Sequence, residues 1–219
     1  MKIAVLGTGM VGRALGGRLA ELGHEVAVGT RDPEATLARD GDFATWAAER
    51  PAIALATFAD AAAGAELVLN ATSGQHSITA LESAGSANLA GKVLLDVANR
   101  LVFSGAGLPT VDASESDSLA ETIQRAFPEA RVVKSLNTMN GDVMADPAIV
   151  AGGDHSVFVS GDDAEAKRIV TGLLEQFGHT DVIDLGGLDT ARATEVALVF
   201  WLRVRMAVGH NRFNFKIAR

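Results

Sequence analysis

Three glycines and one arginine near the start of the chain have the types and the spacing that bind anions. Gly7, Gly9 and Gly12 follow a short apolar run at G-x-G-x-x-G spacing, and Arg31 follows the next apolar run. Backbone without a side chain can approach a phosphate closely, and the N–H groups at the start of a helix attract negative charge. A guanidinium can bind a phosphate through two parallel hydrogen bonds. The pattern therefore predicts a site for a phosphorylated ligand.

The elements that must position these residues follow in the order that such a site requires. Ile3 to Leu6 is an apolar run typical of a buried parallel strand, a helix is expected from Met10, and Gly23 ends it. A second strand, Glu25 to Gly29, completes a βαβ unit. The first glycine permits the turn, the second lets backbone approach a pyrophosphate, and the third allows helix and strand to pack closely. We therefore expect a dinucleotide site; the alternative is a glycine turn with only a structural role.

The end of the second strand indicates which dinucleotide would bind. Proteins that bind NAD usually place a carboxylate there to hold the ribose 2′-hydroxyl. Here the sequence is Gly29-Thr30-Arg31, and the first carboxylate, Asp32, precedes a proline as a helix N-cap does. Arg31 can pair with a 2′-phosphate and Thr30 can donate a hydrogen bond to it. The sequence thus favours NADP; the alternative is that Arg31 is a solvated surface arginine.

Composition limits the class of protein. A chain of 219 residues with 48% hydrophobic and 21% charged residues suits one large domain, or a domain with a small appendage. It has no cysteine, which excludes disulfides, thiolate nucleophiles and cysteine-ligated metals and is compatible with a cytoplasmic enzyme. The net charge of −8 argues against nucleic acid as a partner. No signal segment precedes the first strand and no apolar run reaches about 18 residues, so we expect no membrane association.

Six further apolar runs predict strands, at residues 53–58, 66–71, 92–97, 131–135, 157–160 and 180–185. The predicted fold class is α/β, with a Rossmann-like, doubly wound and mostly parallel sheet and a short helical C-terminal appendage. In such sheets ligands bind at the carboxyl ends of the strands. Ala71 and Thr72 follow one strand end and are expected beside the cofactor, near its nicotinamide ribose. Asn137 follows another strand end and is a candidate substrate contact.

Two segments show no helical or strand pattern. Residues 104–117 are small, polar and acidic, which predicts a loop, and residues 137–156 form a longer irregular region of a size that often acts as a lid. His76 is the one histidine near the expected cleft, and a cap or surface role is expected for it rather than catalysis. No Ser-His-Asp, paired-carboxylate or metal-ligand arrangement follows from spacing. Spacing therefore identifies no catalytic constellation and no metal site.

The last part of the chain is both apolar and basic. One long helix is predicted from Asp189 to Gly209, and Val196 to Trp201 within it is apolar almost all round. Such a helix must be buried, here between the sheet and a second subunit. Residues 190–219 carry six Lys or Arg and one Glu, a net charge of +5 that suits an anionic partner; arginines on a solvated helix face are the alternative. We divide the chain into a nucleotide-binding domain, 1–187, and a helical segment, 188–219.

Four stretches of the sequence resemble the NADPH-dependent coenzyme F-420 reductases, also called F-420H2:NADP oxidoreductases. They are VLGTGMVG with GTRDP, the strand end VLNAT, the middle stretch RVVKSLNTMNGDVM, and TARATE with the closing FNFKIAR. The match runs over essentially the whole chain. The resemblance implies an oxidoreductase that transfers a hydride between the C4 atom of the nicotinamide and the C5 atom of a deazaflavin. Such a transfer needs no acid or base at the hydride, which agrees with the lack of a catalytic constellation.

The resemblance also assigns residues by motif position. Contacts with NADP are implied for the residues of three strand ends, namely Gly7, Thr8, Gly9, Met10, Val11, Gly12, Thr30, Arg31, Ala71 and Thr72. Asn137 and Met139 would line the deazaflavin pocket, which the C-terminal segment would complete. Family members often carry a second basic residue soon after the Arg31 position, and here the next one is Arg39. A homodimer is implied as well.

Two other functions stay open on the sequence. One is an NADPH-dependent reductase of flavins or ferric chelates, because the same domain type occurs in membrane ferric reductases. The other is a non-catalytic module that senses NADP and regulates a partner. Hydride transfer between NADP(H) and coenzyme F-420 is the principal prediction.

Overall fold

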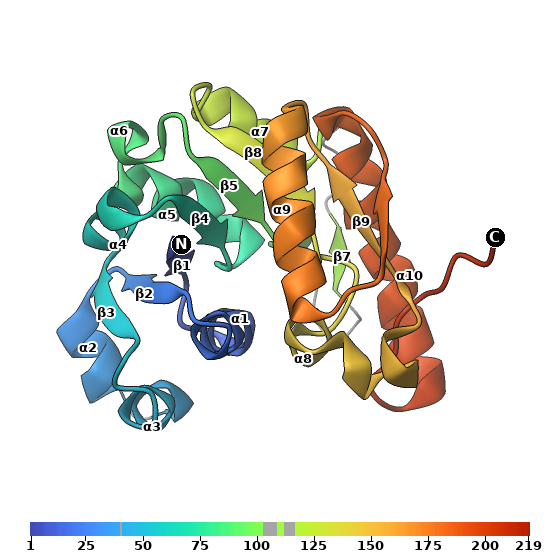
Figure 1. Ribbon diagram of the computed structural model, residues 1–219, viewed down its shortest axis with the longest axis horizontal. Coiled ribbons are helices and arrows are strands. Elements are labelled where there is room, and N and C mark those ends of the chain that lie inside the picture. The colour runs from blue at the N-terminus through green and yellow to red at the C-terminus, as the bar shows by residue number, and fades with distance from the viewer. Residues whose placement is uncertain (40, 103–108, 112–116) are drawn as a thin grey trace.

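A computed structural model describes residues 1–39, 41–102, 109–111 and 117–219 of the chain. Its centre is an eight-stranded sheet in the order β10-β9-β8-β5-β4-β1-β2-β3 (Figure 1). The strands of this sheet are β1 (Lys2–Leu6), β2 (Glu25–Thr30), β3 (Ala54–Thr57), β4 (Leu67–Asn70), β5 (Val93–Asp96), β8 (Arg131–Ser135), β9 (Ser156–Ser160) and β10 (Asp181–Asp184). Each of them was predicted from an apolar run. The mostly parallel, doubly wound fold is therefore confirmed.

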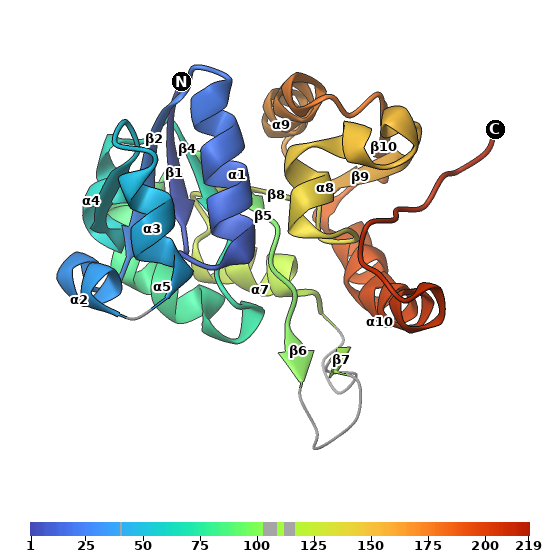
Figure 2. The same cartoon turned by 90° about the horizontal axis from the view of Figure 1, so that it is seen from below.

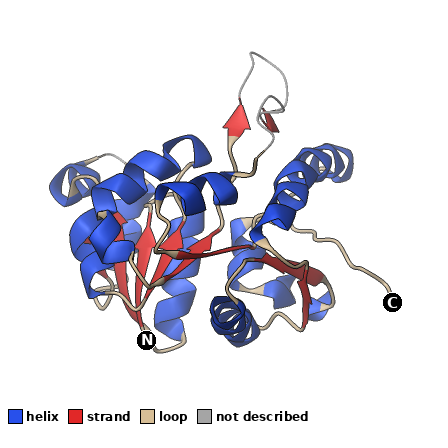
Figure 3. Cartoon of the chain, turned by 90° about the horizontal axis from the view of Figure 1, so that it is seen from above, coloured by secondary structure: helices blue, strands red, loops and turns tan. Residues whose placement is uncertain are grey.

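Helices cover both faces of the sheet (Figure 3). One face packs against α1 (Met10–Glu21), α3 (Asp42–Ala48), α8 (Gly141–Ala145) and α9 (Ala164–Phe177). The other face packs against α4 (Phe58–Gly64), α5 (Ser77–Ala84), α6 (Ser86–Leu89), α7 (Leu119–Ala126) and the start of α10 (Ala191–Val208). Shorter elements are α2 (Pro33–Ala38), η1 (Gly74–His76), η2 (Pro147–Ile149), η3 (Ala151–Gly153) and η4 (Leu188–Thr190).

The two hydrophobic cores follow from the alternation of side chains along buried strands. In β1, Ile3 and Val5 belong to the core on the α1 side, whereas Ala4 and Leu6 belong to the core on the α4 side. All four side chains are fully buried. A strand covered on both faces is apolar throughout, which is why β1 appears in the sequence as a continuous apolar run.

Strand direction reverses once in the sheet, between β8 and β9. These two strands are antiparallel and pair Lys134 with Ser160, whereas β10 is parallel to β9. As a result, β9 and β10 begin at the edge where β8 ends. At that edge the backbone N–H of Ser156 donates to the carbonyl of Phe215, 2.9 Å away, so the C-terminal tail returns to the carboxyl ends of the parallel strands.

The structure differs from the sequence prediction in two segments. The predicted irregular region 137–156 contains α8, η2 and η3, and Val143 and Met144 of α8 are buried in the core. These helical elements are too short to show a hydrophobic period. A small hairpin of β6 (Leu101–Val102) and β7 (Thr110–Val111) projects from the sheet, and β7 lies within the residues predicted as loop (Figure 2). Most of the predicted loop 104–117 lies outside the described residues.

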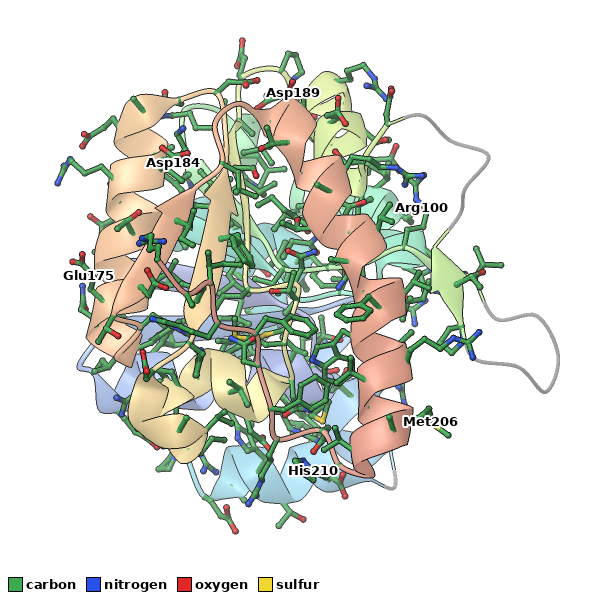
Figure 4. The ribbon with its side chains drawn as sticks, turned by 90° about the vertical axis from the view of Figure 1, so that its right-hand side faces the viewer. Arg100, Glu175, Asp184, Asp189, Met206 and His210 are labelled. Carbon is green, nitrogen blue, oxygen red and sulfur yellow. The ribbon has the colours of Figure 1, made fainter. Side chains whose placement is uncertain are left out.

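The C-terminal helix α10 is covered on one side only. Leu198, Trp201 and Leu202 form a third cluster with the tail residues Phe213 and Phe215, and Trp201 stacks on Phe213 with centroids 5.1 Å apart. Figure 4 shows α10 in front of the sheet, from the end near Asp189 to the end near His210. Phe200 stacks on Phe215 with ring centroids 5.4 Å apart but is still 61% exposed, and Val196 and Met206 are also exposed. The apolar run is therefore buried against the chain's own tail on one side and open on the other.

Candidate nucleotide-binding site

Glycine occupies the three positions of the first turn for different structural reasons. Gly7 has a φ of 120°, and a Cβ there would lie 2.6 Å from the carbonyl oxygen of Ala71. A Cβ on Gly12 would lie 2.0 Å from the carbonyl oxygen of Gly7. Gly9 is different, because no heavy atom of the described residues lies within 4 Å of its Cβ position. The protein itself requires Gly7 and Gly12, whereas the space above Gly9 is room for a ligand.

Helix α1 begins directly at this open space. Gly9 is its N-cap, no side chain caps it, and its first turn has no acidic residue. The first N–H groups of a helix lack partners within the helix and carry partial positive charge. A pyrophosphate at Gly9 would supply the missing acceptors.

A cavity of about 410 Å³ opens from this turn across the carboxyl ends of β1, β2 and β4. It is lined by residues from those strand ends and from the helices beside them, namely Gly7, Thr8, Gly9, Gly29, Thr30, Arg31, Asp32, Thr36, Arg39, Phe58, Ala71, Thr72, Ser73, His76, Thr79, Ala80 and Ser83. Seven of the residues assigned from the sequence lie together here, namely Gly7, Thr8, Gly9, Thr30, Arg31, Ala71 and Thr72. Gly12 lies beneath Gly7, as described above.

Met10 and Val11 lie on the first turn of α1. Met10 is 54% exposed and lines a second hollow on the outer side of α1. Val11 is half-buried and faces Gly141, whose Cβ position is 3.4 Å from the Val11 side chain. Their backbone N–H groups belong to the helix start, so a contact with ligand would come from the backbone rather than from the side chains.

Two threonines that line the cavity, Thr30 and Thr36, form a hydrogen-bonded pair near the end of β2. The Thr36 hydroxyl donates to the Asp32 carbonyl at 2.6 Å, and the Thr30 and Thr36 oxygens are 2.8 Å apart. Since Thr36 has only one proton, Thr30 is the donor to Thr36. Asp32 also caps α2, accepting from the N–H of Ala35 at 2.9 Å as predicted. Arg31 and Arg39 line the same end of the cavity, and sequence reasoning named Arg39 only as the next basic residue.

At the other end of the cavity Thr72 is held by Asn70, the last residue of β4. The Thr72 hydroxyl donates to the Asn70 side-chain oxygen at 2.6 Å, and the Thr72 N–H donates to the same atom at 3.3 Å. Because its proton is engaged, the Thr72 oxygen can offer only an acceptor to a ligand in the cavity. His76 is exposed at the cavity rim, which agrees with the expectation of a surface role.

The two residues assigned to a deazaflavin pocket lie apart from this cavity. Asn137 is only 2% exposed, and its side-chain amide donates to the Asn99 side-chain oxygen at 3.0 Å. The Asn99 amide in turn donates to the Asn137 carbonyl at 2.8 Å, which joins the segments that follow β5 and β8. Met139 is buried in the core, and the amide of Asn214 in the C-terminal tail lies 3.9 Å from its sulfur. The tail therefore reaches the segment that follows β8.

Sequence reasoning missed a buried charged cluster behind the cavity. Lys134 of β8 pairs with Asp96 at 2.7 Å and with Glu195 of α10 at 2.8 Å, and all three side chains are essentially inaccessible. Burial by itself lowers the pKa of Lys134, but the two carboxylates outweigh it and raise that pKa above its usual value. The available signal was a lysine next to two valines within the predicted strand RVVKS, since a buried lysine needs a partner.

Within the described ranges, no helix has the length and hydropathy of a membrane span. The same ranges hold no group of three His, Cys, Asp or Glu side chains that could bind a metal.

A doubly wound sheet with a glycine turn and a cavity at its carboxyl edge is the architecture of dinucleotide-dependent oxidoreductases. Residues 2–100 match the family model described as NADP oxidoreductase, coenzyme F-420-dependent. The F-420-dependent NADP reductase of Methanothermobacter marburgensis is 32% identical over 202 residues, which cover 89% of this chain and 88% of that protein. The chain therefore belongs to the F-420-dependent NADP reductase family and is an oxidoreductase by class.

Two further proteins are similar over most of the chain. A crystal structure of a candidate F-420-dependent NADP reductase from Arthrobacter sp. FB24 is 61% identical, with a TM-score of 0.98 and 100% coverage of both chains. The metalloreductase STEAP3 of Rattus norvegicus is 32% identical over 200 residues, or 89% of this chain. The chain spans only 36% of the length of that metalloreductase. The first similarity confirms the predicted family resemblance over the whole chain.

Proposed function

We propose that the chain transfers a hydride between NADP(H) and the deazaflavin coenzyme F-420. The observation that carries this proposal is the cavity of about 410 Å³, which joins a phosphate-binding turn to two arginines in a chain of this family. In the reducing direction the C4–H bond of NADPH breaks, and its electron pair and hydrogen form a new C–H bond at C5 of the deazaflavin. A proton from solvent completes the reduced deazaflavin, and NADP+ is the other product.

The protein's part in this reaction is to bind and orient two flat rings. Gly9 and the N-terminus of α1 are proposed to bind the pyrophosphate, together with Thr8 and the backbone of Met10 and Val11. Arg31 is proposed to bind the 2′-phosphate. Ala71 and Thr72 are proposed to bind the nicotinamide side.

The deazaflavin is proposed to lie against the segment that follows β8. Asn137 and Met139 are the proposed contacts, and the C-terminal tail would complete the pocket. The contact between Asn214 and Met139 supports this, since Asn214 belongs to the 188–219 segment and Met139 is one of the proposed contacts. For this reason we keep the division into a nucleotide-binding domain, 1–187, and a C-terminal segment, 188–219.

One assay tests the proposal against its rivals. Purified protein is mixed with NADPH and F-420, and separately with NADPH and FMN, while the absorbance of NADPH and of the deazaflavin is followed. Oxidation of NADPH that requires F-420 is the expected result. Oxidation with FMN alone would contradict the proposed acceptor, and tight NADPH binding without turnover would indicate a sensing module.

A second candidate function is reduction of flavin or ferric chelates. The observation that favours it is the 32% identity to the rat metalloreductase. In that case the NADP site would be the same and only the acceptor would differ. Addition of a ferric chelate together with FMN to the assay above distinguishes the two functions.

We also propose that the chain forms a homodimer through α10 and acts in the cytoplasm. Val196 and Phe200 form an exposed apolar face on a helix whose other side is packed, and a second copy would cover that face. Light scattering after size exclusion is expected to give twice the chain mass. Phe200→Asp is expected to shift that mass to the monomer. Cell fractionation of the host tests the location.

A further inference from the structure

A continuous chain of buried polar side chains connects the nucleotide cavity to the C-terminal helix. It begins at Thr72 in the cavity wall and passes through Asn70, Asp96 and Lys134 to Glu195 of α10. The four residues beyond Thr72 are each at most 1% exposed. The hydride transfer proposed above uses none of these four, so their presence needs a separate explanation.

The first step fixes the orientation of Thr72. Its hydroxyl donates to the Asn70 side-chain oxygen, and the Asn70 amide nitrogen donates to Asp96 at 2.8 Å and to Ser77 at 3.0 Å. Asn70 therefore presents its oxygen to Thr72 because its nitrogen is held by acceptors on the other side. If Asp96 moved, the Asn70 amide nitrogen would keep only Ser77 as acceptor, and the Ser77 hydroxyl oxygen also lies 3.0 Å from that of Thr72.

The second step fixes Asp96. One of its oxygens accepts from Asn70 and from the N–H of Ala98, and the other accepts from Lys134 at 2.7 Å. Lys134 donates in addition to the carbonyl of Ala98 and to Glu195. All three protons of the buried ammonium thus have acceptors, as a charge without access to water requires.

The third step brings in the C-terminal helix. Glu195 lies near the start of α10, is 1% exposed, and pairs with Lys134 at 2.8 Å. Its carboxylate also accepts from the N–H groups of Leu119 at 2.9 Å and Ala120 at 3.4 Å, the first residues of α7. Negative charge at a helix N-terminus is favourable, so the position of Glu195 is determined by α7 and Lys134 together.

We propose that Glu195 is a positioning residue, which acts through Lys134, Asp96 and Asn70 to hold the Thr72 hydroxyl oxygen in place as an acceptor in the nucleotide cavity. The ligand group that it would serve is a donor on the nicotinamide half of NADP(H), a ribose hydroxyl or the carboxamide N–H. This inference rests on the proposed NADP site. It assigns to α10 a role in nucleotide binding, although α10 does not line the cavity.

A double-mutant cycle tests the proposal, with the dissociation constant of NADPH measured by titration of the purified chain. Thr72→Val removes the acceptor and is expected to weaken binding about tenfold. Glu195→Gln removes the charge and one acceptor, and is expected to weaken binding about fivefold in the parent but less than about twofold in Thr72→Val. In the Thr72→Ser background, which keeps the hydroxyl, the fivefold effect should return.

The matched control is Glu121→Gln. Glu121 forms the capping box with Ser118 at the same end of α7 but belongs to none of the steps above. The Glu121→Gln variant should lower the melting temperature as Glu195→Gln does, and it should leave the NADPH affinity within about twofold of that of the parent. If Glu195→Gln does not fold, Glu195→Asp keeps the charge but shortens the side chain, and is expected to show the same pattern with a loss of about threefold.

Equal losses for the Glu195 variant in the parent and in Thr72→Val would overturn the proposal, as would an unchanged affinity in the parent. A parent chain that fails to bind NADPH would refute the proposed function, and this inference with it. A parent that binds NADPH but shows additive effects would refute this inference alone.

Discussion

The hydroxyl oxygens of Thr30 and Thr36 lie 2.8 Å apart, and the proton between them belongs to Thr30. Thr36 has already donated to the carbonyl of Asp32, so Thr30 can only accept from other groups while this arrangement holds. A phosphate oxygen is also an acceptor. Attraction for a 2′-phosphate at this end of the cavity is therefore expected from the guanidinium groups of Arg31 and Arg39, whereas the Thr30 hydroxyl links the end of β2 to Thr36 of α2.

Replacement of Arg31 by glutamate is expected to reverse the choice of nucleotide. The carboxylate would repel a 2′-phosphate and could accept a hydrogen bond from a free 2′-hydroxyl. We expect the preference for NADPH over NADH, measured as a ratio of kcat/KM values, to fall by about 100-fold. A variant with the same preference as the parent would refute the assignment of Arg31.

Removal of Arg39 is expected to weaken the binding of NADPH without changing the binding of NADH. Arg39 lies at the end of α2 and lines the cavity together with Arg31, so Arg39→Ala deletes one of two positive charges beside the 2′-phosphate. The expected loss is about fivefold in NADPH affinity at low salt, and smaller at high salt. Arg203→Ala, at an exposed position on α10, is the matched control. Equal losses for NADPH and NADH would contradict the prediction.

Substitutions of Gly9 and Gly7 are expected to have different effects: the first should weaken nucleotide binding, and the second should destabilise the fold. Gly9→Ala meets no described protein atom, so we expect it to cost about 1 kcal/mol of unfolding free energy or less, yet to weaken NADPH binding more than about tenfold. Gly7→Ala places a Cβ against Ala71 at a φ of 120°, and should cost about 3 kcal/mol or more. Urea unfolding and nucleotide titration of both variants check this. A Gly9→Ala protein with parental affinity would show that the space above Gly9 is not used.

His179 should make the fold sensitive to mild acid. Burial, opposed by the hydrogen bond to the Met144 carbonyl and aided by the neighbouring His155, lowers its pKa from 6.5 to about 4. The folded state thus holds fewer protons than the unfolded state between these values, so stability is complete above about pH 6.5 and decreases as the pH falls toward 4. From pH 7 to pH 5 this group alone should remove about 2 kcal/mol.

The test of this prediction is to compare unfolding free energies across that range. His179→Gln can keep the hydrogen bond to Met144 without a titrating ring. From pH 7 to pH 5, its free energy of unfolding should therefore fall by about 2 kcal/mol less than that of the parent. His76→Gln, at the exposed rim of the cavity, should follow the parent. Parallel pH profiles for the parent and His179→Gln would refute the assignment.

The parts of the fold that sequence could predict are those in which one chain segment carries the whole signal. β1, the glycine turn and the cap at Asp32 were predictable because strand burial, turn geometry and capping depend on neighbouring residues. Arg31 followed from the same local reasoning. The reversal between β8 and β9 was not predictable, since an apolar run such as residues 157–160 has the same pattern in either direction.

The charged cluster shows the other limit of sequence reasoning. Asp96, Lys134 and Glu195 are separated by long stretches of chain, and although Lys134 lies within a predicted strand, nothing in the sequence identifies its two partners. Only the topology places β5, β8 and α10 together. The same holds for the exposed side of α10, because the six residues from Val196 to Trp201 are apolar whether a tail, a sheet or another subunit covers them.

The reversal between β8 and β9 determines which loops can be altered without touching the site. Because β9 and β10 run opposite to the other strands, the turns that follow them, at residues 161–163 and 185–187, lie at the edge of the sheet away from the cavity. Gly186 has a φ of 111°, which marks a tight reversal of the chain there. Exposed side chains of these turns are therefore suitable positions for surface labels, whereas the hydrogen bond from the Gly161 N–H to the Gly186 carbonyl, at 3.1 Å, disfavours peptide insertion into them. The turns that follow β1, β2 and β4 form the cavity wall and are not.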